Sequence, residues 1–346
     1  MRILIDLSML RHPWCGLGQI AMSYGRWYAE HPEYIAKGCT VTLLVPKEYV
    51  GSFGDHVEYL QARDIYRILP SLMPKYDVWH SIHQLSPFRP ACRATRRILT
   101  IHDVNFIHEK KGAKQRKYTR RLQKECDSAA ELCFISHYSQ SDTQNHIDCK
   151  LTPQHVIYNG VNDLTSGTQS PLPEDFDRQP FFLSIGVVKK KKNLHTLLPM
   201  MDLLPEYRLI IAGDDSDPYA HKLRGELPRH PNVNMVGTVN DHQRRWLYAH
   251  CAGLLFPSLA EGFGLPVIEA MQWGKPVFCS NSSSLPEIGS KHACYFQDFT
   301  PAHMAAVVKN GLASFTPQKS KDEQDYASTY SYERHMDEYW KLYLTH

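Results

Sequence analysis

The sequence has no run of about 18 uncharged apolar residues, so we expect none of it to cross a membrane as a helix. Its nine cysteines are odd in number and include no C-x-x-C pair. This pattern is typical of reduced thiols in a cytoplasmic protein, and it argues against a disulfide framework or a zinc site. The first ten residues, MRILIDLSML, are interrupted by Asp6 and predict a strand rather than a secretory signal.

A large excess of charge of one sign is also missing. The formal net charge is +3, which is too small to indicate nucleic acid as a partner, but is compatible with an anionic small molecule or a membrane surface. No internal repeat with a solenoid period is present. The 346 residues exceed the size at which single cores stop growing, roughly 250–300 residues, so two domains are expected.

What the sequence does contain is a regular alternation of short apolar runs and helical patterns. This order predicts parallel sheets of βαβ units, and two such series predict an α/β protein with two Rossmann-like, doubly wound domains. The expected strands are residues 2–7, 40–45, 78–82, 97–101, 132–135, 156–158, 181–185, 207–212, 233–236, 253–256, 277–279 and 293–296. Helices are expected at residues 19–31, 115–130, 240–250 and 331–344, and non-periodic stretches at 162–180 and 314–325.

The segment FPSLAEGFGLPVIEAMQWGKPV, residues 256–277, predicts a strand end, a glycine-containing loop and a helix start. Pro266 suits the first helical turn and Gly274 suits the position just after the helix. Backbone N–H groups at such a helix start form a natural anion site. Glu269 would suit a pair of ribose hydroxyls, and Glu261 another polar part of the same ligand. The alternative is a capping carboxylate and a solvated loop glutamate.

A lysine run follows the expected strand that ends at Gly186. Residues 189–192 are all lysine, and a helix is expected from Asn193. Lysines between a strand end and a helix start suit a phosphate, with Lys192 the member expected to face inward. A solvated charged face is the alternative.

Two candidate groups lie in the first half of the chain. Gly16 and Gly18 open an expected helix, where a backbone can approach a ligand closely, but they lie too far past the strand for a dinucleotide fingerprint. His102 and Asp103 end an expected strand, where His102 could bind a hydroxyl or a phosphate and Asp103 could orient it. The alternatives are a plain turn and a structural histidine.

Together these motifs resemble a known family. E-G-F-G-L-P-V-I-E, residues 261–269, is similar to the E-x7-E signature of the retaining glycosyltransferases of family 4, which have the GT-B fold. The motifs around it are similar as well, and they occur in the family's order. They are I-D (5–6), G-x-G (16–18), H-D (102–103), I-S-x-x-S (135–139), Y-N-G-V (158–161), K-N (192–193), A-G (212–213), F-P-S-L (256–259), E-A-M-x-x-G-x-P-V (269–277) and S-S-L-P-E (283–287).

The resemblance implies donor-binding roles for the second half of the chain. Glu269 would bind the ribose hydroxyls and Glu261 would face the transferred sugar. Lys192 would neutralise the diphosphate, and Lys191 is the candidate for a second cation. Many family members carry arginine at the position of Val187, directly after the glycine equivalent to Gly186, and this chain does not. The backbone of residues 263–265 (Phe263, Gly264, Leu265) would contact the sugar hydroxyls and the diphosphate.

For the first half, the resemblance implies that the loop of Gly16 and Gly18 closes on the diphosphate. His102 would lie beside the donor sugar, and Asp103 would serve the acceptor. The expected domains are residues 1–165 for the acceptor, 178–328 for the nucleotide-sugar, and a helix at 329–346 that crosses back to the N-terminal domain.

The implied activity is transfer of a sugar, with retention, from a nucleotide-diphosphate sugar to a hydroxyl of a glycan or lipid-linked acceptor, as in polysaccharide or lipopolysaccharide assembly. GDP-mannose or a UDP-sugar is the favoured donor. No cofactor and no metal are expected, and the D-x-D spellings at 175–177 and 215–217 are interpreted as chance acidic loops. The alternatives are another GT-B enzyme, such as a nucleotide-sugar epimerase or a phosphorylase, and a non-catalytic sugar-binding protein.

A basic stripe provides a further hypothesis about location. Five cationic residues fall at helical spacing, beside apolar residues, and could contact anionic lipid at the inner face of a membrane. The alternative is a solvated helix face. The five are Lys110, Lys114, Lys117, Arg121 and Lys124.

Overall fold

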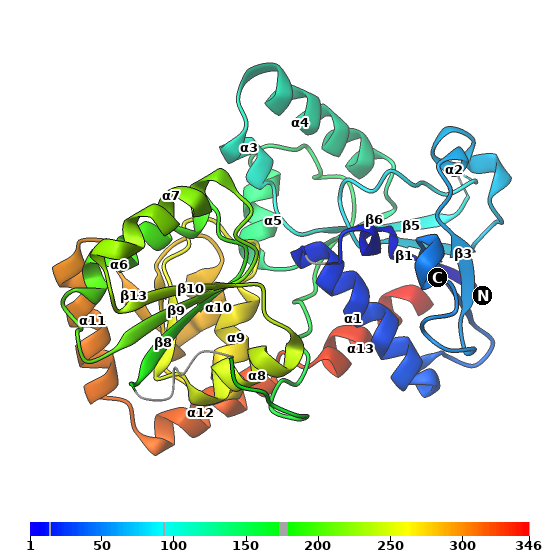
Figure 1. Cartoon of the computed structure of the whole chain (residues 1–346). Helices are drawn as coiled ribbons and strands as arrows, with labels where there is room; N and C mark the ends of the chain where they lie inside the picture. The colour runs from blue at the N-terminus through cyan, green and yellow to red at the C-terminus, as the bar shows by residue number, and fades with distance from the viewer. Residues whose placement is uncertain (14, 93, 173–178, 346) are drawn as a thin grey trace. The chain divides into compact units, whose positions relative to one another are not determined.

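The computed structural model describes residues 1–346 except 14, 93, 173–178 and 346. The chain divides into two compact units (Figure 1). Unit 1 contains Met1–Tyr158 and Asp337–His346, and unit 2 contains Asn159–Met336. Each unit is built on one sheet whose described strand pairs are all parallel. The predicted class, α/β with two Rossmann-like sheets, is confirmed.

The sheet of unit 1 has the order β3-β2-β1-β4-β5-β6-β7. Six of its strands lie within two residues of their predicted positions, but β3 was not predicted. This strand, with the sequence EYLQ, lies at the sheet edge, pairs with β2 and is at most half-buried. An edge strand of this kind does not need an apolar run, so the sequence carried no signal for it. The strands are β1 (Arg2–Asp6), β2 (Thr40–Val45), β3 (Glu58–Gln61), β4 (Val78–Ser81), β5 (Arg96–Ile101), β6 (Glu131–Phe134) and β7 (Gln154–Val156).

Helices cover both faces of this sheet. On one face, α4 packs over an apolar cluster that includes Leu99, Leu122 and Phe134. Alternation along the strands turns other side chains to the opposite face, where the end of the last helix, α13, packs. The helices of unit 1 are α1 (Gly16–Glu30), α2 (Ile65–Ile68), α3 (Asn105–Glu109), α4 (Gly112–Asp127), α5 (His137–Gln144) and the end of α13 (Tyr332–Leu344), with 3-10 turns at Ser8–Arg11, Pro32–Tyr34, Lys47–Tyr49 and Pro70–Leu72.

A buried polar network attaches the end of α13 to the sheet of unit 1. His80, on β4, lies 2.6 Å from the Tyr343 hydroxyl through Nδ1 and 2.8 Å from Thr100 Oγ1 through Nε2. Thr100 in turn lies 2.7 Å from the Tyr339 hydroxyl. All four side chains are buried. Because buried polar groups are costly unless paired, this network fixes how the C-terminal residues pack on unit 1.

The sheet of unit 2 has the order β10-β9-β8-β11-β12-β13, so the strand order reverses between β8 and β11. Ligands of doubly wound sheets bind at such a reversal, outside the carboxyl ends of the strands. All six strands were predicted to within one residue. They are β8 (Phe181–Ile185), β9 (Arg208–Ala212), β10 (Val233–Gly237), β11 (Gly253–Phe256), β12 (Val277–Ser280) and β13 (Cys294–Phe296).

The main apolar cluster of unit 2 joins α6, α7 and α11 to the sheet through residues such as Leu197, Leu223, Val308 and Phe278. One prediction is wrong here: most of the expected non-periodic stretch at 314–325 is helical, because α12 begins at Pro317 with the Thr316 hydroxyl as its cap. The helices are α6 (Leu197–Met201), α7 (Pro218–Glu226), α8 (Asp241–His250), α9 (Leu265–Gln272), α10 (Leu285–Gly289), α11 (Pro301–Ala313) and α12 (Pro317–Ser328), with 3-10 turns at Lys190–Lys192, Leu194–Thr196, Leu227–Arg229 and Ser290–His292.

Glu323, on α12, makes the stability of unit 2 dependent on pH. Burial raises its pKa from 4.5 to about 8, and one carboxyl oxygen has no hydrogen-bond partner among the described residues. The folded state therefore holds a proton that the unfolded state releases, so this stabilisation is complete below pH 4.5 and lost as the pH rises towards 8.

We expect Glu323→Gln to remove this pH dependence. Relative to the unaltered protein, the variant should gain on the order of 3 kcal/mol of unfolding free energy between about pH 5 and about pH 8. Urea unfolding at both pH values measures the gain. An equal decline in the two proteins would contradict the prediction.

All nine cysteines are free, and five are buried. Burial raises the pKa of the thiols of Cys126, in unit 1, and Cys251, in unit 2, to about 12. Buried thiols of this kind are inert, since only the thiolate is a strong nucleophile. The five are Cys126, Cys133, Cys149, Cys251 and Cys279.

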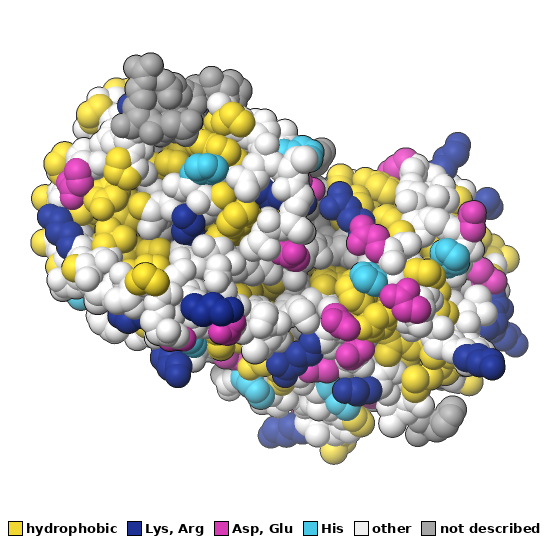
Figure 2. All heavy atoms as spheres, turned by 90° about the horizontal axis from the view of Figure 1, so that it is seen from below, with side chains coloured by type: hydrophobic (Ala, Val, Ile, Leu, Met, Phe, Trp, Pro, Cys, Tyr) yellow, Lys and Arg dark blue, Asp and Glu magenta, His cyan; other side chains and the backbone are white. Residues whose placement is uncertain are grey.

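No helix in the described part of the chain is both long and apolar enough to cross a membrane. On the face drawn in Figure 2, lysine and arginine side chains are interspersed with aspartate and glutamate. This mixture agrees with the small net charge of +3.

Candidate functional site

Two glycines shape the carboxyl edge of the sheet in unit 2. Gly186 follows β8 with a φ of +136°, and Gly213 follows β9 with a φ of +137°. A Cβ at Gly213 would overlap the carbonyl oxygen of Gly186. Only glycine adopts these conformations without strain, so the two loops can approach each other closely.

Lys192 follows Gly186 at the end of a single 3-10 turn, Lys190–Lys192, and precedes Asn193, which has a φ of +56°. Its Nζ lies 2.5 Å from Glu261 Oε1 and 4.9 Å from the centroid of the Phe256 ring. The side chains of Lys192 and Glu261 are 16% and 13% exposed. The structure therefore brings together two predicted site residues that are 69 positions apart, as a largely buried ion pair.

Backbone contacts hold the loops on either side of this pair. The carbonyl oxygen of Lys191 accepts from the Leu259 N–H at 2.8 Å and from the Ser258 hydroxyl at 3.3 Å. The Glu261 N–H donates to Ser283 Oγ at 3.0 Å, and the Ser284 hydroxyl donates to the Phe263 carbonyl at 2.6 Å. The segment that carries Glu261 is thus bonded to the loops that follow β8 and β12.

Helix α9 begins directly after this segment. Gly264 is its N-cap with a φ of +113°, Pro266 lies in the first turn, and within the described residues no side chain caps the helix start. Gly274, with a φ of +58°, follows the helix end, as predicted. Uncapped N–H groups and the helix dipole make this helix start suitable for an anion. Phe263, just before it, is buried and packs against Tyr330.

We expect Gly264→Ala to weaken this helix start. An added Cβ would lie 2.7 Å from Leu285 Cδ2, and the positive φ would be strained for alanine. The loss in unfolding free energy should be about 1–3 kcal/mol, measured by urea unfolding. Gly225→Ala is the matched control, because it lies within α7 and no described atom is within 4 Å of its added Cβ. Equal stability of the two variants would contradict the prediction.

Glu269 lies inside α9 with a side chain that is 5% exposed. One carboxylate oxygen pairs with the Arg244 guanidinium, and the other accepts from the Tyr248 hydroxyl at 2.7 Å. Burial opposes the charge of Arg244, but the nearby carboxylate of Glu269 outweighs this and raises the pKa of Arg244. Arg244 and Tyr248 thus orient the carboxylate, which keeps lone pairs for further hydrogen bonds.

Sequence reasoning missed Arg244 and Tyr248. Both lie on α8, four positions apart, so they project from the same face of that helix. Their spacing in DHQRRWLY was visible in the sequence, but nothing there indicated which helix they face.

The glycines of unit 1 lie inside the first turn of α1, which begins at Gly16 rather than at residue 19 as predicted. Cys15 is the N-cap, and its Sγ accepts from the Gly18 N–H at 3.4 Å. A Cβ at Gly18 would overlap the carbonyl oxygen of His12, whereas no described atom lies within 4 Å of a Cβ at Gly16. Packing alone therefore explains Gly18, and the space beside Gly16 leaves the backbone accessible.

His102 follows β5 and is buried, and burial lowers its pKa. Its Nε2 lies 2.7 Å from the Ile82 carbonyl oxygen, so the neutral ring donates there, and Nδ1, which has no hydrogen-bond partner among the described residues, is left as an acceptor. Asp103 Oδ1 accepts from the Asn105 N–H at 3.0 Å, and its charge raises the pKa of His102, against the larger effect of burial. Burial, followed by the charge of Arg121 as a smaller cause, also lowers the pKa of the nearby His83 to about 3.

The two aspartates of the D-x-D spelling at 215–217 both contact other groups of unit 2. Asp215 pairs with Arg224, and Asp217 caps α7 through the Tyr219 N–H at 2.9 Å. The spelling at 175–177 lies outside the described residues. Within the part of the chain that is described, no three His, Cys, Asp or Glu side chains gather as a metal site would require.

The predicted basic stripe is only partly correct. Lys110 lies before α4, which begins at Gly112, and its Nζ is 5.2 Å from the centroid of the Tyr118 ring. Arg121 turns inward and donates to the Leu85 carbonyl at 2.6 Å. Lys114, Lys117 and Lys124 are exposed on α4.

Comparison with known families agrees with this arrangement. Residues 28–163 match the model described as Glycosyltransferase Family 4, and residues 170–310 match the model described as Glycosyl transferases group 1. The chain belongs to this family of glycosyltransferases, and its two units have the GT-B fold, as predicted.

Among curated proteins, the chain is similar to O-antigen mannosyltransferases. It is 29% identical to O-antigen chain mannosyltransferase B of Escherichia coli over 57% of this chain and 56% of that protein. It is 26% identical to the O-antigen chain mannosyltransferase RfbU of Salmonella typhimurium over 70% of this chain and 71% of that protein. Among solved structures, HepE of Anabaena with UDP and glucose has a TM-score of 0.75 at 17% identity, covering 99% of both chains.

Proposed function

We propose that this protein is a retaining glycosyltransferase that moves a sugar from a nucleotide-diphosphate sugar to a hydroxyl of a glycan or lipid-linked acceptor. The main support is the set of groups at the carboxyl edge of unit 2: the Lys192–Glu261 pair, the uncapped start of α9 and the oriented carboxylate of Glu269. A cation, a helix start and an acceptor of hydroxyl hydrogen bonds match the diphosphate and the ribose of one ligand.

In the proposed reaction, the bond between the anomeric carbon and the diphosphate oxygen breaks. The acceptor oxygen forms the new bond on the same face of the sugar, which retains the configuration. The acceptor proton passes to an oxygen of the departing diphosphate. Negative charge grows on that diphosphate, and Lys192, Lys191 and the N–H groups at the start of α9 would stabilise it, because they are fixed before the reaction begins.

Glu261 and His102 would act on the sugar rather than on the diphosphate. Glu261 holds the Lys192 ammonium and keeps further lone pairs for sugar hydroxyls. His102 is neutral, and its free Nδ1 can accept from a hydroxyl. Asp103 is the proposed contact with the acceptor.

GDP-mannose is the favoured donor, because both curated relatives described above are mannosyltransferases. A thermal-shift series with UDP-, GDP-, ADP- and dTDP-sugars tests this, since a ligand that binds only the folded state raises apparent stability with the logarithm of its concentration. Release of the nucleoside diphosphate with a glycan acceptor would establish transfer. Failure of every nucleotide-sugar to bind would contradict the proposal.

We further propose a cytoplasmic location with peripheral contact to a membrane, through the exposed lysines of α4. A second observation supports this contact: unit 1 also exposes the apolar side chains of Ile65, Ile68, Leu69 and Leu72. Basic residues together with exposed apolar side chains favour anionic lipid surfaces.

Reversing the charge of Lys114, Lys117 and Lys124 should abolish binding to vesicles that contain phosphatidylserine at low salt, as measured by flotation. The matched control reverses three exposed lysines of unit 2, Lys291, Lys309 and Lys321. Unchanged vesicle binding of the α4 variant would contradict the membrane contact.

A further inference from the structure

Unit 1 contains a cavity of about 760 Å³ that the donor-binding proposal does not use. This volume is within the range of small-molecule sites, roughly 300–1,000 Å³. Three segments line it: the one after β3, the loop after β4, and α4. The lining residues are Asp64, Arg67, Ile68, Pro70, Ser86, Pro87, Arg89, Arg121 and Glu125.

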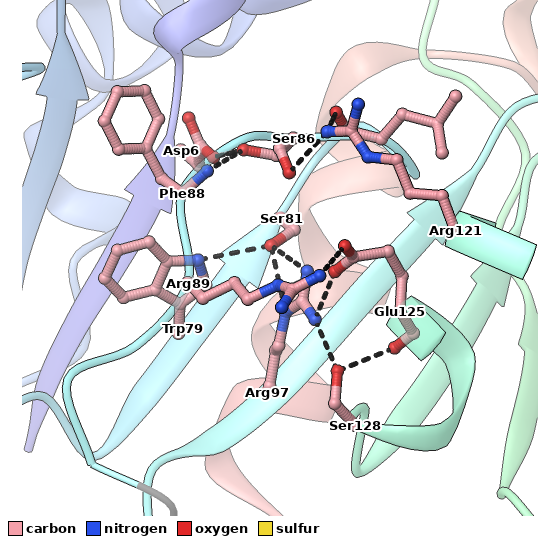
Figure 3. Close-up of polar contacts among 11 residues, drawn as sticks. Asp6, Trp79, Ser81, Ser86, Phe88, Arg89, Arg97, Arg121, Glu125 and Ser128 are labelled. Atoms are coloured by element: carbon pink, nitrogen blue, oxygen red, sulfur yellow. Dashed lines mark hydrogen bonds and ion pairs between the residues drawn. The ribbon is translucent and has the colours of Figure 1, made fainter. Parts of the chain in front are cut away.

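Glu125 is the buried carboxylate of this cavity, and it forms ion pairs with two arginines, Arg89 and Arg97. It lies 2.9 Å from Arg97, which is itself buried and donates to Ser128 Oγ at 2.8 Å and to Ser81 Oγ at 3.3 Å. Glu125 also pairs with Arg89, whose side chain is half-exposed. Figure 3 shows the two guanidiniums meeting at this one carboxylate. The charge of Arg97 alone is enough to neutralise Glu125, so the charge of Arg89 remains in surplus.

Arg121 has no carboxylate partner in the described part of the chain. Its Nη2 donates to the carbonyl oxygens of Leu85 and Ser86, at 2.6 and 3.3 Å (Figure 3). Asp6, also drawn there, accepts from the Ser86 hydroxyl and from the Ser8 N–H. Burial raises the pKa of Asp6, which disfavours its charged form. The guanidinium of Arg121 therefore has no carboxylate partner among the described residues and keeps unused donors beside the cavity.

The other side of the cavity is positive as well. Asp64 lies 3.4 Å from Arg67 and 3.4 Å from Arg11, so two guanidiniums share one carboxylate. Among the lining residues as a whole, the three arginines Arg67, Arg89 and Arg121 outnumber the two carboxylates Asp64 and Glu125. A concave site with surplus guanidinium charge favours a planar or tetrahedral oxyanion, because the guanidinium fork can bind two of its oxygens at once.

We infer that this cavity binds a negatively charged group of the acceptor, a phosphate or a carboxylate carried on a sugar, with Arg89 and Arg121 as its contacts. The inference rests on the proposed function, because it assigns this cavity to the second substrate of that reaction. The groups proposed to bind the diphosphate and the ribose lie in unit 2, whereas this cavity lies entirely in unit 1. The acceptor class is therefore an anionic glycan rather than a neutral one.

Three sugars that differ only at C6 test the inference on the full chain: D-glucose, D-glucose 6-phosphate and D-glucuronate. Titration calorimetry is done with a saturating nucleoside diphosphate, so that the donor site is filled. At least one charged sugar should bind about tenfold or more tightly than the neutral one. Whether the phosphate or the carboxylate binds better identifies the group. Equal binding of all three sugars, or no binding, would overturn the inference.

Arg89→Gln and Arg121→Gln should each weaken binding of the charged sugar about tenfold or more, since each removes a charge-assisted contact. Glutamine at 121 keeps a donor for the Leu85 and Ser86 carbonyls, which protects the fold. Arg229→Gln, at an exposed position of unit 2, is the matched control. Unchanged affinity in both cavity variants would overturn the inference.

Inorganic phosphate separates a glycan site from a site for a free ion. If it binds as tightly as glucose 6-phosphate, with the same dependence on Arg89 and Arg121, the assignment to the acceptor is wrong. Nucleotide-sugar binding is measured on the same proteins. If the unaltered protein binds nucleotide-sugars but no charged sugar, the inference fails and the proposed function stands. If it binds no nucleotide-sugar, the proposed function fails.

Discussion

Replacing Lys192 by alanine is expected to lower kcat for sugar transfer by about 10²–10³-fold. The ammonium lies beside Glu261 at the end of the 3-10 turn that follows β8, where a departing diphosphate would gain charge. Its stabilising effect grows as that charge develops, so the loss should fall mainly on kcat. Steady-state kinetics with a nucleotide-sugar, measured as release of nucleoside diphosphate, gives both kcat and KM.

Lys190→Ala is the matched control, because this lysine belongs to the same turn but is exposed. It should keep the kcat of the unaltered protein. Because Lys192→Ala also leaves Glu261 without its partner, urea unfolding must show that the variant is folded under the assay conditions. A folded Lys192→Ala protein with unchanged kcat would remove Lys192 from the proposed mechanism.

The second large effect is expected at Glu269. Glu269→Ala leaves the Arg244 guanidinium, whose side chain is 26% exposed, without its carboxylate. Breaking a fully buried pair costs about 3–5 kcal/mol of unfolding free energy, so we expect a loss near the lower end of this range. The variant should also bind the nucleotide about 100-fold more weakly, because the acceptor for the ribose hydroxyls is gone. Urea unfolding and titration calorimetry measure the two effects separately.

A nucleotide without ribose hydroxyls separates recognition from stability. The 2′,3′-dideoxy form of the bound nucleotide should bind the unaltered protein and a folded Glu269→Gln variant equally well, whereas the normal nucleotide should distinguish them. Glu226→Ala, in an exposed pair with Arg229, controls for loss of a surface carboxylate and should change stability by less than about 1 kcal/mol. Equal binding of the normal nucleotide to both proteins would contradict a ribose role for Glu269.

The sequence was sufficient for most of the fold because buried parallel strands are continuous apolar runs. FFLSI and RLIIA, which form β8 and β9, bury nearly all of their side chains and were located to within a residue. EYLQ, which forms β3, is half-exposed at an edge and left no such run. Helix α12 was missed for a similar reason, because PQKSKDEQDYAS is polar and its main buried residues are Glu323 and Ala327.

The sequence indicated which segments carry the candidate site residues, but not which side chains contact one another. The motif around Glu261 and Glu269 indicated a helix start, and α9 begins at Leu265. The Lys192–Glu261 ion pair and the contact of Arg244 with Glu269 depend on the lateral order of strands and helices, which no local motif encodes. The same holds for Arg89, Arg97 and Glu125, which meet only because α4 packs over β5.

The buried cysteines provide a separate probe of local opening in each of the two units. Cys126 and Cys133 can react with an alkylating reagent only when unit 1 opens, and Cys251 and Cys279 only when unit 2 opens. Mass spectrometry of the modified peptides would therefore time the opening of the two units separately in one unaltered sample. A nucleotide-sugar bound to unit 2 would slow the modification of Cys251 and Cys279 and leave the modification rate of Cys126 and Cys133 unchanged. The pattern of modified cysteines would therefore show which unit holds a ligand.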